Sequence, residues 1–175
     1  MLLIIKIISL LLIFVLSSFA GILISNKYNM RVKEIEDMIS ALDLLETRVK
    51  YTYDTIADSF DFIAENMKTK AYRIFMIASS MLLNNTNISA GDIFRNVVDD
   101  ESIFLSINKE DKEILKGLGT SLGQMDLEGQ IKNIVLVKQL LEKQLNDAVE
   151  EKSKNFKLTR NMGVFVGLII LIILI

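Results

Sequence analysis

The hydrophobic pattern divides the chain into an apolar start, an amphipathic middle and an apolar end. Residues 1–25 carry a single charge, Lys6, and residues 161–175 end in GVFVGLIILIILI without any charge. A helix of about 20 mostly apolar residues can cross a hydrocarbon core of about 30 Å. The pattern therefore predicts a transmembrane anchor over 1–25 and a transmembrane segment over 161–175, with a helical domain over 26–160 between them.

The first apolar stretch has a second interpretation, a secretory signal peptide that is removed. Ser18-Phe19-Ala20 before Gly21 is a tolerable small-x-small cleavage site. However, the single Lys is set among leucines and isoleucines, which is a poor start for such a peptide, and the apolar run is longer than such peptides carry. We favour an uncleaved anchor, and a mature N-terminus at Gly21 stays open as the alternative.

Two long amphipathic helices are predicted, one following the first anchor and one leading into the second. The first has apolar residues at helical spacing: Ile35, Met38, Ile39, Leu42, Leu45 and Val49. The second keeps the same spacing: Leu127, Ile131, Ile134, Leu141, Leu145, Ala148 and Val149. Such spacing places the side chains along one side of a helix. Each apolar stripe then needs another helix of the same domain to cover it.

Shorter helices are predicted between these two. Polar residues that can cap helix N-termini occur at three places: Thr55 with Asp58, Ser89 with Asp92, and Ser106 or Asn108. A further helix is expected from Lys70 to Leu83. The chain contains no Pro, which suits uninterrupted helices. We therefore predict an all-α bundle of five to seven helices.

One Gly-rich run stands out, Gly117-Leu-Gly-Thr-Ser-Leu-Gly-Gln-Met-Asp126. It does not fit a phosphate-binding loop, because no Lys follows the glycines and no strand is predicted before them. We interpret it as a tight connection between helices. Gly119 and Gly123 would form the turn, and Asp126 would cap the helix that follows.

The composition narrows the chemistry. Without Cys or His the chain has no disulfides, no Cys/His metal site, no thiol nucleophile and no His-based triad. A net charge of −2 argues against a nucleic-acid surface. Asp99, Asp100 and Glu101 are adjacent carboxylates on an expected loop, which we interpret as a solvated charge run rather than a metal site. No cofactor, no metal and no enzymatic activity are predicted.

A family resemblance rests on both halves of the chain. The C-terminal half carries a Leu-Gly-x-x-Leu-Gly-x-x-Asp turn followed by a long helix with a Gly-x-x-x-Gly apolar tail: Leu118, Gly119, Leu122, Gly123, Asp126, Gln130, Ala148, Glu150, Glu151, Lys157, Arg160, Gly163 and Gly167. The N-terminal half agrees at Gly21, Tyr28, Arg31, Leu42, Leu45, Glu46 and Tyr51. These residues resemble the stage III sporulation protein AB family of endospore-forming bacteria. Arg48 and Lys50 depart from its acidic or apolar pattern, and Asp54 or Thr55 replaces a usual Pro.

The resemblance implies a fold similar to the inner-membrane platform protein of type II secretion and type IV pilus machines. It implies a structural component of the mother-cell side of a secretion-like channel, in the membrane around the forespore. The implied partners are other proteins of the stage III channel complex and membrane lipid, not nucleic acid, with self-association left open. The alternative is a membrane-tethered helical adaptor or sensor that binds a single soluble partner.

Topology follows from the positive residues beside the two anchors: Lys27, Arg31, Lys33, Lys152, Lys154, Lys157 and Arg160. Such residues are retained on the cytoplasmic side, so we expect the domain in the mother-cell cytoplasm, with Tyr28, Arg31 and Lys33 at the lipid headgroups. A lone Lys6 also resembles a signal anchor that would send the domain outward, and this alternative stays open. Gly163 and Gly167 have the spacing for close transmembrane helix packing, or are ordinary membrane glycines.

Overall fold

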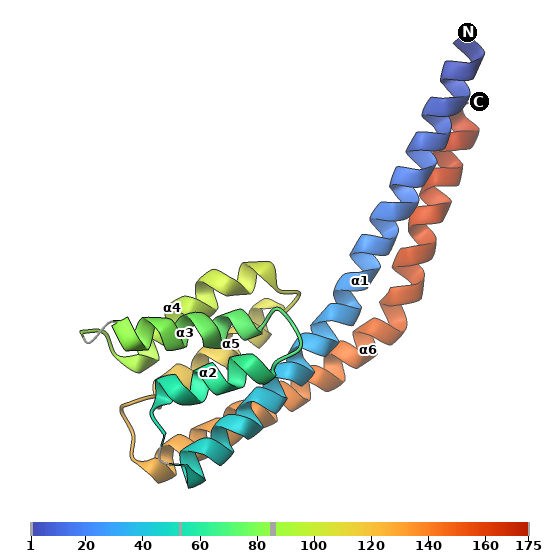
Figure 1. Cartoon of the computed structure of the whole chain (residues 1–175). Coiled ribbons are helices and arrows are strands. Elements are labelled where there is room, and N and C mark those ends of the chain that lie inside the picture. Colours follow the sequence, from blue (N-terminus) through green and yellow to red (C-terminus); the bar gives the residue numbers. More distant parts are fainter. Residues whose placement is uncertain (1, 53, 85–86, 175) are drawn as a thin grey trace. The chain divides into compact units, whose positions relative to one another are not determined.

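The computed structural model of the chain describes residues 2–52, 54–84 and 87–174. Within the helices, the side chains of 2–11, 13, 14, 18, 159, 160, 163, 164, 167 and 171–174 are not described. Figure 1 shows the elements in chain order: α1 (Leu2–Tyr51), α2 (Ile56–Asn66), α3 (Tyr72–Asn84), α4 (Ala90–Glu101), η1 (Ser102–Phe104), α5 (Lys109–Lys116), η2 (Gly117–Thr120) and α6 (Leu127–Leu174). These ranges contain helices and no strand, so the predicted all-α class is confirmed.

Contacts divide the chain into two units. The terminal unit comprises Met1–Met30 and Ala148–Ile175, and the central unit comprises Arg31–Asp147. In the terminal unit the first part of α1 and the last part of α6 run side by side in opposite directions (Figure 1). The boundaries predicted from hydropathy, 1–25, 26–160 and 161–175, concern membrane segments and stay a prediction.

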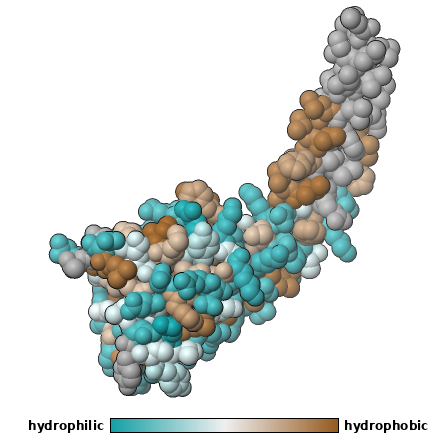
Figure 2. Space-filling model, in the orientation of Figure 1, coloured by the Kyte–Doolittle hydropathy of each residue, from teal (hydrophilic) through white to brown (hydrophobic). Residues whose placement is uncertain are grey.

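The terminal unit exposes apolar side chains along both of its helices (Figure 2). Those at least half exposed are Leu12, Val15, Leu16, Phe19, Ile22, Leu23, Ile24, Leu158, Met162, Phe165 and Ile169. Within the described part of the chain, none of the helices has an apolar stretch of the length that a membrane crossing needs. Part of each predicted anchor, including residues 2–11 and 171–174, has side chains that lie outside that part.

The core of the central unit forms around three aromatic rings. Phe60 of α2, Phe75 of α3 and Phe94 of α4 have no exposed surface, and their ring centroids lie 5.4 to 5.9 Å apart. Offset and edge-to-face rings at such distances attract one another beyond simple area burial. The three short helices are therefore held together by one aromatic cluster.

The predicted stripe of α1 lies largely inside the central unit. Ile35, Met38, Leu42 and Leu45 are fully buried, as expected. In α6 the prediction is wrong at two ends of the stripe, because Leu127 is 53% and Val149 is 48% exposed. Ile134, Leu141 and Ala148 are buried as predicted, and Val137 and Gln144 are buried beside them although the predicted stripe omits them. Their spacing alternates between three and four residues, so the buried face of α6 includes a polar residue that a hydrophobic pattern overlooks.

The predicted N-terminal caps are present. Thr55 Oγ1 accepts the Asp58 N–H and Ser89 Oγ accepts the Asp92 N–H, both at 3.1 Å. At both caps the hydroxyl donates a hydrogen bond to the carboxylate, which does not reach the backbone N–H of the cap residue, so the capping box is only half formed. Asn108, rather than Ser106, caps α5.

Candidate functional site

A buried cluster of one cation, one carboxylate and one amide side chain joins three helices of the central unit. Arg31 of α1 donates from Nε to Asp111 Oδ2 at 2.8 Å and from Nη2 to Asp111 Oδ1 at 3.0 Å. The same Nη2 donates to Gln144 Oε1 of α6 at 3.1 Å. Asp111 has no exposed surface, and Arg31 and Gln144 are 6% and 3% exposed. A two-pronged ion pair of this kind fixes the orientation of both groups.

The local sequence explains why Asp111 points inward. It is the third residue of α5, and it completes a capping box in which Asn108 Oδ1 accepts the Asp111 N–H and Asp111 Oδ2 accepts the Asn108 N–H, both at 2.8 Å. Arg31 is therefore bound inside the central unit, and its expected place at lipid headgroups is wrong. The cluster connects α1, α5 and α6 and leaves no carboxylate oxygen of Asp111 without a donor.

A second buried carboxylate joins α1 to the segment before α5. Glu34 is 2% exposed, and its Oε2 accepts the Ser106 N–H at 2.6 Å. Burial raises the pKa of Glu34, while the Ser106 N–H and the charge of Lys70 act in the opposite direction. This carboxylate holds a loop in place and has one backbone donor.

The Gly-rich connection packs directly on α4. A Cβ added at Gly91 would lie 2.0 Å from the Gly119 carbonyl oxygen, and one added at Gly119 would lie 2.7 Å from the Gly91 carbonyl oxygen. Neither position has room for a side chain. Gly123 has φ of +72°, a conformation that side chains disfavour.

Polar side chains fasten this connection to the start of α6. Asn133 Nδ2 donates to the Gly117 and Leu118 carbonyl oxygens at 3.1 and 3.3 Å and to Ser121 Oγ at 2.8 Å. Asp126 precedes α6, and its Oδ1 accepts the Gly129 N–H at 2.9 Å. The structure thus places Gly119, Gly123 and Asp126 around one turn, whereas the surroundings of Gly163 and Gly167 lie outside the described residues.

The acidic run at 99–101 lies on the last turn of α4, so its expected place on a loop is wrong. Asp99 pairs with Lys112 at 2.7 Å and with Lys116 at 2.8 Å, and these hydrogen bonds hold the pKa of Asp99 below its usual value. Glu101 pairs with Arg73 at 2.5 Å. Two of the three carboxylates are thus occupied by cations from other helices. No group of metal-ligating side chains occurs among the described residues.

Two residues that depart from the family pattern contact each other. Arg48, near the end of α1, forms an ion pair with Asp54 beyond the helix. The guanidinium carbon of Arg48 lies 4.2 Å from the ring centroid of Phe62 on α2. The positive charge of Arg48, which departs from the acidic or apolar family pattern, is therefore paired with a carboxylate of the same chain.

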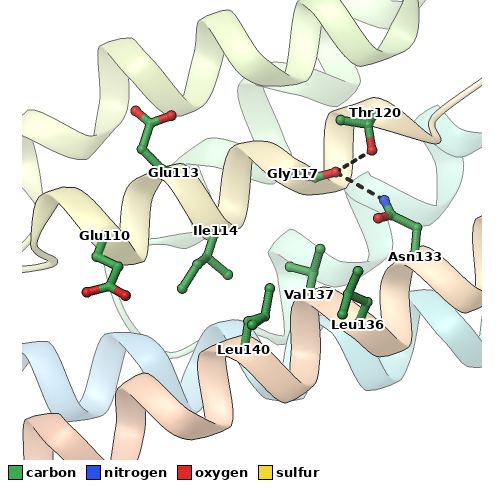
Figure 3. A pocket seen from close by; sticks show the side chains of 9 residues that line it. All are labelled: Glu110, Glu113, Ile114, Gly117, Thr120, Asn133, Leu136, Val137 and Leu140. Carbon is green, nitrogen blue, oxygen red and sulfur yellow. Dashed lines mark hydrogen bonds between the residues drawn. The ribbon is translucent and has the colours of Figure 1, made fainter.

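An apolar groove runs between α5 with η2 on one side and α6 on the other (Figure 3). Its volume is about 450 Å³. The residues that line it are Glu110, Glu113, Ile114, Gly117, Thr120, Asn133, Leu136, Val137 and Leu140. Leu136 and Leu140 are 52% and 40% exposed. The hydrophobic pattern of the sequence does not reveal this groove, because its two walls are distant in the chain.

The fold and these sites define a class of protein. It is an all-helical protein in which two long helices extend from a helical domain into apolar ends, and the buried charged groups of that domain hold helices and loops together. The chain belongs to the stage III sporulation protein AB family, whose sequence model matches residues 6–175. The resemblance inferred from the Gly-rich turn and the apolar tail is confirmed.

Individual relatives agree with the family. The chain is 26% identical over 162 residues to stage III sporulation protein AB of Bacillus subtilis (strain 168), covering 93% of this chain and 94% of the relative. It is also similar to a solved structure of stage III sporulation protein AB (SpoIIIAB), with a TM-score of 0.67 and 26% identity. That match covers 71% of this chain and 98% of the solved chain. A role related to sporulation and a SpoIIIAB-like helical fold follow.

Proposed function

We propose that the chain is a membrane-anchored structural platform component of the mother-cell secretion-like channel needed for endospore formation. It acts through helix–helix and protein–protein contacts rather than by catalysis. The observation that carries this proposal is the family match over residues 6–175, which includes both apolar ends and the whole helical domain. The matched family is a sporulation family and not a known family of enzymes.

The polar interior of the domain supports a structural role. The carboxylates of Asp111 and Glu34 are buried, and each is bound by donors from another segment of the central unit. An active site built on such groups needs at least one of them to face a substrate. Asp111 and Glu34 instead connect helices and loops, as expected in a rigid scaffold.

The exposed apolar side chains of the terminal unit support anchoring in the mother-cell membrane around the forespore. Soluble monomers rarely expose large contiguous apolar patches, because their hydration is unfavourable. Leu16 and Phe19 on α1 and Phe165 on α6 are each more than half exposed. Lipid would cover these side chains, and the sequence continues toward the two ends with mostly apolar residues, Lys6 being the one charge.

Complementation in a sporulating host tests the proposal. With the host's own gene deleted, heat-resistant spores should be lost, and the full chain should restore them. A variant truncated before residue 161 should not restore them, although its domain accumulates to the same level. Full restoration by the truncated variant would refute a membrane-anchored role.

A further inference from the structure

We propose that the groove between α5 and α6 is a docking site for a basic amphipathic helix of a partner protein. The inference rests on the proposed function only in that a platform acts through protein contacts. All nine lining residues belong to the central unit, so the site lies within one part of the molecule.

The floor of the groove is an apolar surface that the chain itself leaves open. Leu136 and Leu140 are one helical turn apart on α6 and remain 52% and 40% exposed, although Val137 beside them is buried. Ile114 faces them from α5 (Figure 3). A gap remains beside Val137 because Gly117 has no side chain there, and an added Cβ would meet Val137 Cγ2 at an ordinary 3.8 Å.

The polar groups at one end of the groove are already satisfied. Thr120 Oγ1 and Asn133 Nδ2 both donate to the Gly117 carbonyl oxygen, at 2.8 and 3.1 Å (Figure 3). An occupant therefore gains little from hydrogen bonds there. Most of its binding energy would come from covering the leucine side chains.

The charged residues that line the groove indicate which kind of partner helix would bind there. Glu110 and Glu113 line the α5 side, and no cation belongs to the lining. In the described part of the chain Glu110 forms no ion pair, and Glu113 has one contact with Lys116 at 3.7 Å. Two exposed carboxylates beside an apolar floor favour a partner that presents Lys or Arg next to its apolar residues.

The geometry favours a helix over other occupants. Both walls are helical, and the exposed leucines of α6 have i, i+4 spacing. Side chains with this spacing form a ridge that fits between the side-chain rows of another helix. The described residues include no strand edge to which an extended segment could pair. The exposed leucines of the floor span one turn of α6, from Leu136 to Leu140, so a single short helix is enough to cover them.

Peptide binding to the full chain tests the inference. The chain is reconstituted in phosphatidylcholine nanodiscs, and the probe is a fluorescent stapled helix of about 15 residues with Leu at i, i+4 and i+7 and flanking Lys. A matched probe replaces each Lys by Glu, and empty nanodiscs give the background. Fluorescence anisotropy should show that the chain binds the Lys probe at least about tenfold more tightly than the Glu probe.

Variants locate the binding. Leu140→Lys should weaken binding of the Lys probe about tenfold or more, because it puts a cation on the apolar floor. The double variant Glu110→Gln with Glu113→Gln should weaken it several-fold and reduce its dependence on salt. Gln139→Lys is the control, since Gln139 is exposed on α6 and does not line the groove, and it should leave binding unchanged.

Three results would overturn the inference: no binding of the Lys probe, equal binding of both probes, or unaltered binding by Leu140→Lys. Sedimentation of a dimer that Leu140→Lys dissociates would assign the groove to a second copy instead. These assays contain no other sporulation protein. A failure here therefore leaves the complementation result intact, and failed complementation leaves the peptide result intact.

Discussion

At the scale of single residues, Asp111 links the start of one helix to the rest of the central unit. Its carboxylate caps α5 through the Asn108 N–H and receives the guanidinium of Arg31. Both ionised groups are almost fully removed from water. Such a pair adds less to stability than its Coulomb energy suggests, but losing one partner leaves a buried charge without compensation.

Asp111→Asn should therefore destabilise the domain by about 3–5 kcal/mol, because Arg31 would remain charged inside the core. Chemical denaturation of the full chain, followed by circular dichroism, measures the change. Asp100→Asn is the matched control, since Asp100 is exposed on α4, and it should stay within about 0.5 kcal/mol of the parent. An equal effect of both substitutions would mean that the Arg31 pair is not what stabilises the fold.

Glu34 predicts a pH dependence with a definite sign. Burial raises its pKa in the folded state above the ordinary value of 4.5. Its contribution to stability is thus fully present below that value and is lost as the pH rises through the folded-state pKa. Glu34→Gln keeps an oxygen that can accept the Ser106 N–H but cannot ionise. The variant should be more stable than the parent at pH 8, and this difference should shrink at pH 4; a constant difference in denaturation midpoints would disprove it.

At the scale of helices, the sequence predicts features that depend on neighbouring residues better than features that depend on contacts between distant helices. Thr55, Ser89 and Asn108 were recognisable as caps because capping depends on residues three positions apart. Gln144 was missed because a polar residue on the buried face of α6 is invisible to hydrophobic periodicity. The last turn of α4 is likewise not predicted, because the ion pairs of Asp99 come from Lys112 and Lys116 on another helix.

The same reasoning applies to the candidate site. Gly123 was predicted as a turn residue from its neighbours, whereas the close approach of Gly91 to Gly119 depends on how α4 meets η2. The groove was likewise absent from the sequence, since Ile114 and Leu140 meet only when α5 packs on α6. Tertiary placement, rather than composition, creates both features.

The two faces of α6 give a prediction at this scale. Leu141 is fully buried and Leu136 is 52% exposed on the same helix. Leu141→Asp should unfold the domain, because burying an unpaired carboxylate costs more than a marginally stable domain can tolerate. Leu136→Asp should keep the helical circular dichroism and the cooperative transition. Similar spectra for both variants would show that α6 does not bury the face assigned to it.

At the scale of the whole molecule, the proposed membrane topology places the domain in the mother-cell cytoplasm. The chain contains no Cys, so one introduced thiol reports its own side of the membrane. Asn96→Cys is suitable because Asn96 is exposed on α4. In vegetative cells that express the variant, a membrane-impermeant maleimide should label it only after the cells are opened. Labelling in intact cells would place the domain on the opposite side and favour the signal-anchor alternative.

The composition of the assembly purified from sporulating cells tests the platform role most directly. The tagged chain is extracted from membranes in mild detergent, and the co-purifying proteins are quantified by mass spectrometry against an untagged strain. A platform component should retain several other stage III sporulation proteins in fixed ratios. The Leu141→Asp variant should lose all of these proteins at once. Recovery of one soluble protein in equal amount, without other stage III proteins, would contradict the platform role and identify the chain as an adaptor.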